Sequence, residues 1–291
     1  MVSKKRSTLF KTVTGTITTA LLASSLAFSG ASAQTTNYEF GSQDFTIAFK
    51  SESVPSNFKD FMNSLGAKVE TELNSIGVVQ VEVDGNPSKF LKSTLSHKEV
   101  LTVTPSIELP LDLPDVNVDE TATVGTAMPE LPALTEDESI WESGYQWDIE
   151  RVTNNGASHA ISSGSKDTVV AVIDTGFDFD HPDLKNNIVP GSKTFVPGTT
   201  DAWDKHSHGT HVAGTIGANG RMKGIAPEVG LRAYRVFNTG GAQQIWITNA
   251  ILAAADDKVD VINMSLGGFR TNGQWTYVDP VTGERIKLGG D

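Results

Sequence analysis

Residues 110–140 divide the chain into two parts that differ in composition. The segment contains four prolines and eight acidic residues: Pro110, Pro114, Pro129, Pro132, Asp112, Asp115, Asp119, Glu120, Glu130, Glu136, Asp137 and Glu138. Such a sequence buries little apolar surface and favours an extended, solvated linker. An ordinary surface loop is the alternative, but loops of this length are uncommon inside compact domains. The 291 residues are therefore interpreted as about two domains joined by a linker.

The first 33 residues have the pattern of an export signal. A basic start precedes an apolar stretch, and Ala31-Ser32-Ala33 fits the small-residue rule, so we expect cleavage before Gln34. A transmembrane anchor is the alternative, but Thr and Ser dilute the stretch well below a spanning helix. Because no other segment is apolar enough to cross a bilayer, we expect a secreted protein without membrane association after removal of the signal.

The charge balance and the lack of cysteine exclude several classes of site. The chain has 35 acidic and 23 basic residues, a net charge of -12 and no cysteine. Phosphate contacts need clustered Lys and Arg, so we expect no nucleic-acid partner. Without cysteine there is no disulfide scaffold, thiolate zinc site or cysteine nucleophile. The hydrophobic fraction of 38% is sufficient for a packed core.

Residues 34–109 predict a small α+β domain. Phe45, Ile47 and Phe49 alternate with polar or small residues, as in a half-buried strand. The other expected elements are a helix from Phe58 to Leu65, strands over 69–73 and 76–83, a helix over 88–95 and a strand over 100–104. This β-α-β-β-α-β order is the split ferredoxin-like arrangement, which many small modules share.

Residues 141–291 predict an α/β domain with a doubly wound parallel sheet. The apolar run from Val169 to Ile173 leads into Asp174, and further strands are expected over 231–237 and 259–264, with a helix over 245–255 between them. Open α/β sheets bind ligands at the carboxyl ends of their strands. Asp174 and Ser265 occupy such positions.

A histidine cluster provides the second candidate site. Three of the six histidines lie between residues 206 and 211, and the small residues that follow indicate a helix packed closely against a neighbour. Ser207 is the expected N-cap of this helix, which places His208 in its first turn. A metal site is the competing interpretation, because His206, His208 and His211, together with Asp204, are zinc-ligand types.

Three motifs together resemble the subtilisin-like serine peptidases. They are Val-Ala-Val-Ile-Asp-Thr-Gly at 170–176, His-Gly-Thr-His-Val-Ala-Gly at 208–214 and Val-Ile-Asn-Met-Ser-Leu-Gly-Gly at 261–268. Their order is Asp before His, as in that family's Asp…His…Ser triad. The resemblance covers roughly residues 145–268, and residues 34–109 resemble the family's inhibitor-type propeptide. It implies a secreted endopeptidase precursor that acts on peptide or protein substrates and is inhibited by its own propeptide.

The resemblance also implies a role for individual residues. Asp174 matches the triad carboxylate, His208 the general base and acid, and His211 a structural histidine. Ser265, Leu266 and Gly267 match the strand that binds the substrate backbone. The segment from Gly240 and Gly241 to Gln244 matches the opposite substrate strand, so that an extended peptide would bind between the two edges.

The resemblance also bears on metal ions. No cofactor is required for catalysis, and the flanking motifs make a metal ion at the triad an unfavourable interpretation. Calcium is possible, since Asp183 matches a family calcium ligand. The loop 219–222 that would supply further ligands is short, and Ca²⁺ needs about six or more oxygen atoms. We therefore do not expect this particular site to be kept.

The serine nucleophile has no match in the chain. The family carries it in a Gly-Thr-Ser-Met-Ala motif, which these 291 residues lack, and Ser265 is their last serine. We therefore expect a precursor truncated before the catalytic serine and inactive as given. Two alternatives remain: a complete, non-catalytic chain that keeps a peptide groove, and a metal-dependent protein that uses the histidine cluster.

Overall fold

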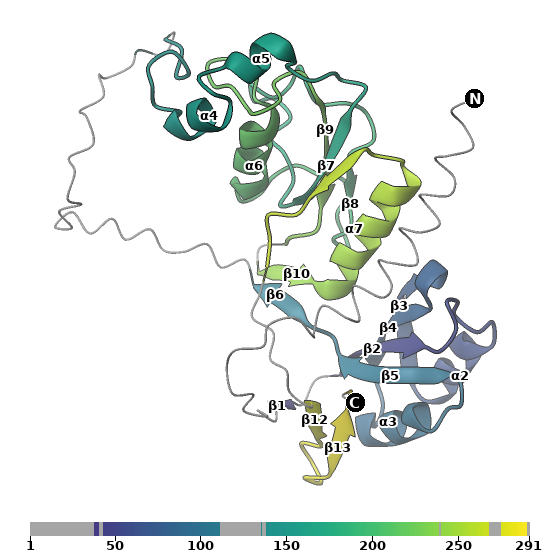
Figure 1. Ribbon diagram of the computed structural model, residues 1–291. Coiled ribbons are helices and arrows are strands. Elements are labelled where there is room, and N and C mark those ends of the chain that lie inside the picture. The colour runs from purple at the N-terminus through teal and green to yellow at the C-terminus, as the bar shows by residue number, and fades with distance from the viewer. Residues whose placement is uncertain are drawn as a thin grey trace, which may run out of the picture. The chain divides into compact units, whose positions relative to one another are not determined.

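The structure is a computed structural model that describes residues 43–110, 135, 138–238, 240–267 and 275–289, and the backbone of residues 38–40. The predicted signal, residues 1–33, and most of the predicted linker lie outside the described residues. The chain forms two compact units, each with its own core (Figure 1). The first unit combines Met1–Ser106 with Phe269–Asp291, and the second unit is Ile107–Gly268. None of the helices in the described ranges has the length and hydropathy that a membrane crossing needs.

Residues 43–105 of the first unit, called the N-terminal module below, contain two helices and a four-stranded antiparallel sheet. The elements follow the order that the sequence pattern predicts: β2 (Asp44–Phe49), α2 (Phe58–Ser64), β3 (Ala67–Leu73), β4 (Val78–Val83), α3 (Pro87–Leu95) and β5 (Val100–Pro105). The strand order in the sheet is β3-β4-β2-β5. Ile76 lies in a short 3-10 turn, Asn74–Ile76, and not in the predicted strand, because Gly77 adopts a left-handed φ of 60° there.

The core of the N-terminal module forms where alternate residues of β2 face the helices. Phe45, Ile47 and Phe49 are buried, whereas their neighbours on the strand are partly exposed. The ring of Phe45 packs 5.5 Å from that of Phe90 in α3, and the ring of Phe49 lies edge-on to Phe58 of α2 at 4.4 Å between centroids. The period-two pattern of the sequence thus predicted the buried face of β2.

A second small sheet completes the first unit. It consists of β1 (Tyr38–Phe40), β12 (Trp275–Val278) and β13 (Arg285–Leu288), in the order β1-β12-β13. β12 and β13 form an antiparallel hairpin, and β1 pairs parallel with β12. Tyr277, Ile286 and Leu288 of the hairpin belong to the same hydrophobic cluster as Phe45 and Phe90.

The second unit is built on a parallel sheet with helices on both faces. Its strand order is β11-β7-β9-β8, where β7 is Val169–Asp174, β8 Lys193–Thr194, β9 Gly230–Arg235 and β11 Val261–Asn263. Val170 and Val172 pack with Ala213 of α6 (His208–Gly217). Ala171 and Ile173 pack with Ala250 of α7 (Gln244–Asp256) on the opposite face (Figure 1). This arrangement confirms the predicted doubly wound α/β fold.

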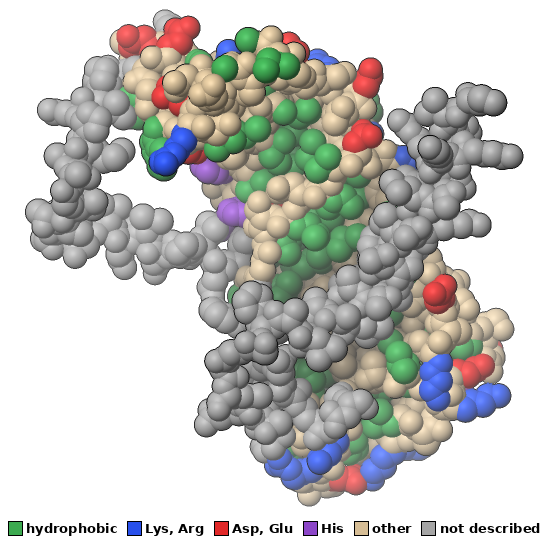
Figure 2. Space-filling view, viewed as in Figure 1, with side chains coloured by type: hydrophobic (Ala, Val, Ile, Leu, Met, Phe, Trp, Pro, Cys, Tyr) green, Lys and Arg blue, Asp and Glu red, His purple; other side chains and the backbone are tan. Residues whose placement is uncertain are grey.

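The remaining elements of the second unit are short. They are β6 (Glu108–Pro110), α4 (Trp147–Val152), α5 (Ala157–Ile161) and β10 (Gly241–Gln243). The strand expected over 259–264 is shorter, because Lys258 and Val259 donate backbone hydrogen bonds that close the end of α7. Hydrophobic side chains gather on the visible face of this unit (Figure 2), and the strand-end residues Val261 and Met264 are about half exposed.

Candidate active site

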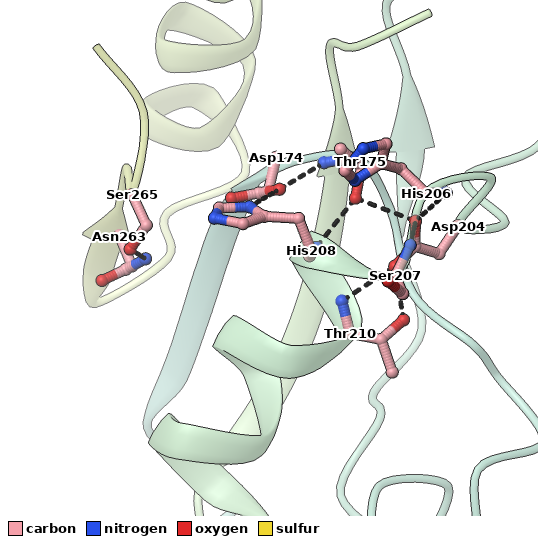
Figure 3. A network of polar contacts seen from close by, with 10 residues as sticks. Asp174, Thr175, Asp204, His206, Ser207, His208, Thr210, Asn263 and Ser265 are labelled. Atoms are coloured by element: carbon pink, nitrogen blue, oxygen red, sulfur yellow. Dashed lines mark hydrogen bonds and ion pairs between the residues drawn. The ribbon is translucent and has the colours of Figure 1, made fainter. Parts of the chain in front are cut away.

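Asp174 lies at the carboxyl end of β7 and is completely buried. Its Oδ1 accepts a hydrogen bond from Nδ1 of His208 at 2.8 Å and another from the backbone N–H of Thr175 at 2.7 Å (Figure 3). Because an ionised carboxylate only accepts hydrogen bonds, Nδ1 of His208 carries the proton and Nε2 is left as the basic nitrogen. The structure therefore brings together the two residues that the sequence analysis assigned to a catalytic pair.

The close approach of α6 to the turn after β7 positions His208. The backbone N–H of Gly209 donates to Thr175 Oγ1 at 2.8 Å. A Cβ atom on Gly209 would lie 2.3 Å from the carbonyl oxygen of Gly176, well inside van der Waals contact. Only glycine at position 209 allows the helix to begin this close to β7, which brings the His208 side chain within reach of Asp174.

The side chain of Asp204, and not that of Ser207, caps α6. Ser207 occupies the N-cap position, but its side chain makes no capping hydrogen bond and its φ is 83°. Asp204 Oδ1 accepts from the backbone N–H groups of His206 and Ser207 at 2.8 and 2.9 Å, and Oδ2 accepts from the N–H of Thr210 at 2.9 Å (Figure 3). The predicted N-cap position of Ser207 is therefore confirmed, but the capping hydrogen bond to the helix goes to the carboxylate of Asp204 and not to the Ser207 side chain.

Thr175 links this cap to the pair of Asp174 and His208. Its hydroxyl donates to Asp204 Oδ1 at 2.8 Å while it accepts from Gly209. The sequence analysis assigned no role to Thr175, and it considered Asp204 only as a metal ligand. The signal for Asp204 was its position two and three residues before the N–H groups that it binds, which is typical of capping Asx turns.

The two carboxyl groups of the site have opposite pKa shifts. Burial raises the pKa of Asp174 above its ordinary value, although hydrogen bonds from His208 and Thr175 oppose the rise. Burial also favours a higher pKa for Asp204, but hydrogen bonds from Thr210, His206 and Ser207 together lower it below 3.8. The stabilisation from ionised Asp204 is therefore present above its ordinary pKa, and it is lost as the pH falls through the lower folded-state value.

Ser265, Leu266 and Gly267 follow β11, directly beside β7. The register pairs Asn263 with Val172, so both strands end at the edge where Asp174 lies. The Asn263 amide donates to Ser265 Oγ at 3.0 Å, and both residues are labelled at the end of β11 in Figure 3. Ser265 and Gly267 are exposed, so their backbone is accessible for pairing with an extended chain.

Gly240 directly precedes β10 and Gly241 is its first residue, and β10 pairs antiparallel with β6. The register sets Gly241 opposite Pro110 and Ala242 opposite Leu109. A Cβ atom on Gly241 would lie 2.6 Å from the carbonyl oxygen of Leu109, so glycine permits this close strand pairing. The Leu109 side chain is buried in a cluster that includes Phe237 and Ile247. A segment of the chain itself thus lies along the predicted substrate strand.

The described residues give no support to the metal interpretation of the histidine cluster. Among them, no group of three or more His, Cys, Asp or Glu side chains is arranged to hold a metal ion. His206 and His211 are exposed, and His208 is hydrogen-bonded to Asp174.

The candidate calcium ligand Asp183 binds the short loop directly. Its Oδ1 accepts from the N–H of Arg221 and its Oδ2 from the N–H of Met222, both at 3.0 Å. Backbone N–H groups of the loop 219–222 thus occupy the side of the Asp183 carboxylate where a cation would bind. Calcium at this position does not fit this geometry.

This geometry predicts the effect of chelation. Removing metal ions should not change the Tm of the protein with Asp183 in place. Asp183→Ala should lower the free energy of unfolding by about 1–3 kcal/mol, because two N–H groups lose their acceptors. Thermal unfolding with and without EDTA measures both, and Asp180→Ala, at an exposed neighbouring acid, is the control. A fall in Tm on chelation that is absent in Asp183→Ala would show a bound cation instead.

Comparison with known proteins shows similarity to one family of peptidases. Residues 165–284 match the model of the subtilase family. The nisin leader peptide-processing serine protease of Lactococcus lactis subsp. lactis is 35% identical over 190 residues, which are 61% of this chain and 27% of that protein. Subtilisin E of Bacillus subtilis is 32% identical over 251 residues, 84% of this chain and 56% of that protein. The chain thus spans between about a quarter and somewhat more than half of these relatives.

Solved structures agree with the fold. The epidermin leader peptide-processing serine protease from Staphylococcus aureus superposes with a TM-score of 0.61 at 24% sequence identity, over 78% of this chain and 50% of that one. Fervidolysin from Fervidobacterium pennivorans, described as related to subtilisin, gives a TM-score of 0.57 at 22% identity, over 83% of this chain and 40% of that one. These likenesses show a subtilisin-like fold.

Proposed function

We propose that this chain, which carries a subtilase-family domain, belongs to a secreted serine endopeptidase precursor with an Asp-His-Ser triad. The observation that carries the proposal is the 2.8 Å hydrogen bond between His208 and the fully buried Asp174. A serine hydroxyl attacks the peptide carbonyl, and Nε2 of His208 takes its proton. Asp174 stabilises the imidazolium that forms, and water then releases the acyl-enzyme. No cofactor takes part in this reaction.

The nucleophile is not assigned to any of the 291 residues. Ser265 belongs to the proposed substrate strand, and Ser192 and Ser207 lack the surrounding motif of the family. Ser192 Oγ also accepts a hydrogen bond from the backbone N–H of Ala233 at 3.0 Å. The 291-residue chain by itself is therefore expected to be inactive towards peptide substrates.

The substrate groove of the proposal lies between β10 and the segment 265–267. An extended peptide adds to such strands through backbone hydrogen bonds, while side-chain pockets select alternate residues. The pairing of β6 with Gly241 and Ala242 supports this use of β10, because a segment of the chain already makes it. The burial of Leu109 next to β10 supports a preference for an apolar side chain at that position.

We further propose that the N-terminal module with β6 acts as an inhibitory propeptide and folding aid. β6 directly follows the module and lies on the strand that a substrate would use, so it competes with substrate in the uncut chain. Removal of residues 1–33 on export, followed by cleavage of the linker near Leu134 to Glu142, would then separate the inhibitor from the peptidase domain.

The test compares the 291-residue chain with a longer product of the same gene that includes a Gly-Thr-Ser segment. The longer form should hydrolyse casein, lose this activity with a fluorophosphonate and lose it in His208→Ala. Hydrolysis that resists the fluorophosphonate but stops with EDTA would overturn the proposal in favour of metal-dependent chemistry. Fluorophosphonate-sensitive turnover by the 291-residue chain itself would show that one of its own serines is the nucleophile.

A non-catalytic peptide-binding protein is the second candidate, and the β6–β10 pairing favours it equally. It retains the groove and requires no serine nucleophile. The absence of any Gly-Thr-Ser segment in the gene, in every reading frame beyond codon 291, would favour this function over the first. Two of the relatives are named for processing leader peptides, so a peptide of that class is the first ligand to test for either function.

A further inference from the structure

The hairpin β12–β13 spans the C-terminal end of the segment that matches the subtilase family, yet its side chains complete the core of the N-terminal module. Tyr277 and Leu288 are fully buried, and Ile286 is 9% exposed. The ring of Tyr277 meets Phe45 of β2 edge-on, with 6.1 Å between ring centroids. About 230 residues separate these two rings in sequence, so the contact depends on a specific docking of the hairpin.

Polar contacts join the same hairpin to α3. Ser88 Oγ donates to Asp279 Oδ2 at 2.6 Å, and Lys92 Nζ pairs with Glu284 Oε1 at 2.5 Å. Ser88 and Asp279 are both buried, whereas the ion pair is exposed and contributes little stability. The Ser88–Asp279 hydrogen bond is therefore a buried polar contact that helps to orient the hairpin on α3.

Asp279 also fixes the turn of the hairpin. Its Oδ1 accepts from the N–H groups of Val281 and Thr282 at 2.9 and 2.8 Å. The hydrogen bond from Ser88, followed by those from Thr282 and Val281, lowers the pKa of Asp279 to about 2. One carboxylate thus holds the turn in shape and binds α3, so the hairpin presents Tyr277 to the module in a fixed conformation.

We propose that residues 275–288 form a docking hairpin whose partner is the surface of the N-terminal module alongside α3. The hairpin is covalently continuous with the subtilase segment, so it provides a second attachment of the module besides β6. This inference rests on the proposed function for its biological meaning: cleavage of residues 110–140 leaves the inhibitory module bound until the hairpin contacts are also lost.

The test uses the full chain with a recognition sequence for a site-specific protease placed within residues 115–130 and an affinity tag at the C-terminus. All variants also carry Leu109→Asp, which weakens the attachment through β6. After cutting, the N-terminal piece should remain on the tagged piece. Adding Tyr277→Ala should speed its release about 100-fold, because a large buried side chain is lost from the docked core.

Two further variants separate docking from unfolding. Asp279→Ala leaves the apolar core unchanged and should speed release about tenfold, because the buried hydrogen bond to Ser88 is lost. Val281→Ala changes a hairpin residue that is 91% exposed and should release the piece at the parent rate. Circular dichroism before cutting verifies that each variant is folded.

Immediate release of the N-terminal piece from the Leu109→Asp parent, or equal release rates in all three hairpin variants, would overturn the proposal. Because an added protease makes the cut, these outcomes do not depend on any activity of the chain. Failure of the docking hairpin is therefore distinguishable from failure of the proposed peptidase function, which the fluorophosphonate experiment decides.

Discussion

Replacing Asp174 with asparagine is expected to lower kcat for peptide hydrolysis about 10⁴-fold in a serine-containing form of the protein, the magnitude typical of serine-protease triads in general. The geometry explains why neither amide orientation rescues the site. An amide nitrogen at the Oδ1 position loses the hydrogen bonds from both His208 and Thr175. An amide oxygen there keeps both bonds but places the NH₂ group where Oδ2 is buried without a partner among the described residues.

The kinetic signature of Asp174→Asn should be confined to the chemical step. Asp174 is fully buried, and its proposed role is to stabilise the imidazolium of His208, so KM should change far less than kcat. Steady-state kinetics on a peptide substrate measure the separate changes in kcat and KM. Asp180→Asn, at an exposed acidic residue, is the control. A loss of kcat below about tenfold would contradict the triad assignment of Asp174.

The second large effect is expected from a single added methyl group in α6. Gly209→Ala should lower the free energy of unfolding by about 3 kcal/mol or more, because its Cβ would overlap the carbonyl oxygen of Gly176 and the backbone of the turn cannot easily move. The start of α6 must shift away from β7 to relieve this overlap. His208 would move with it and lose its hydrogen bond to Asp174, so activity should fall as well.

Gly214→Ala in the same helix is the matched control. A Cβ at Gly214 would meet no atom within 4 Å, so alanine there should stabilise the helix by about 0.5–1 kcal/mol. Denaturant unfolding of both variants measures the two effects, which are expected to have opposite signs. Equal stabilities of Gly209→Ala and Gly214→Ala would show that the close approach of α6 to β7 does not occur.

Much of the fold could be predicted from the sequence because the relevant patterns are local. The alternation of Phe45, Ile47 and Phe49 defined the buried face of β2, and the apolar run ending at Asp174 predicted β7. In both cases the spacing of apolar residues within the strand itself shows which of its side chains are buried. This inference does not require knowing which distant residues cover them. The Asp174–His208 pair was also predicted, but through the resemblance of three motifs rather than through any local rule.

The capping of α6 shows where local rules fail. Ser207 is the N-cap residue, as its type and position predict, yet its backbone is left-handed and the side chain of Asp204 accepts the capping hydrogen bond instead. Two contacts favour capping by Asp204: the hydrogen bond from the Thr175 hydroxyl to Asp204, and the close packing of Gly209 against Gly176. Those contacts join residues about thirty positions apart, and a propensity for the cap position does not include them.

The sequence alone predicted most of the helices and strands and the pairing of Asp174 with His208, because strand alternation, helix spacing and the three motifs are patterns of neighbouring residues. Only the tertiary structure decided which side chains meet across the chain: Asp204 with the start of α6, Leu109 with the strand β10, and Tyr277 with the core around Phe45. The physical reason is that such contacts depend on the matching of buried surfaces and of hydrogen-bond partners far apart in sequence. Residues 110–140 marked a division by composition, whereas the hairpin that follows the subtilase motifs packs into the core of the N-terminal module on the other side of that division.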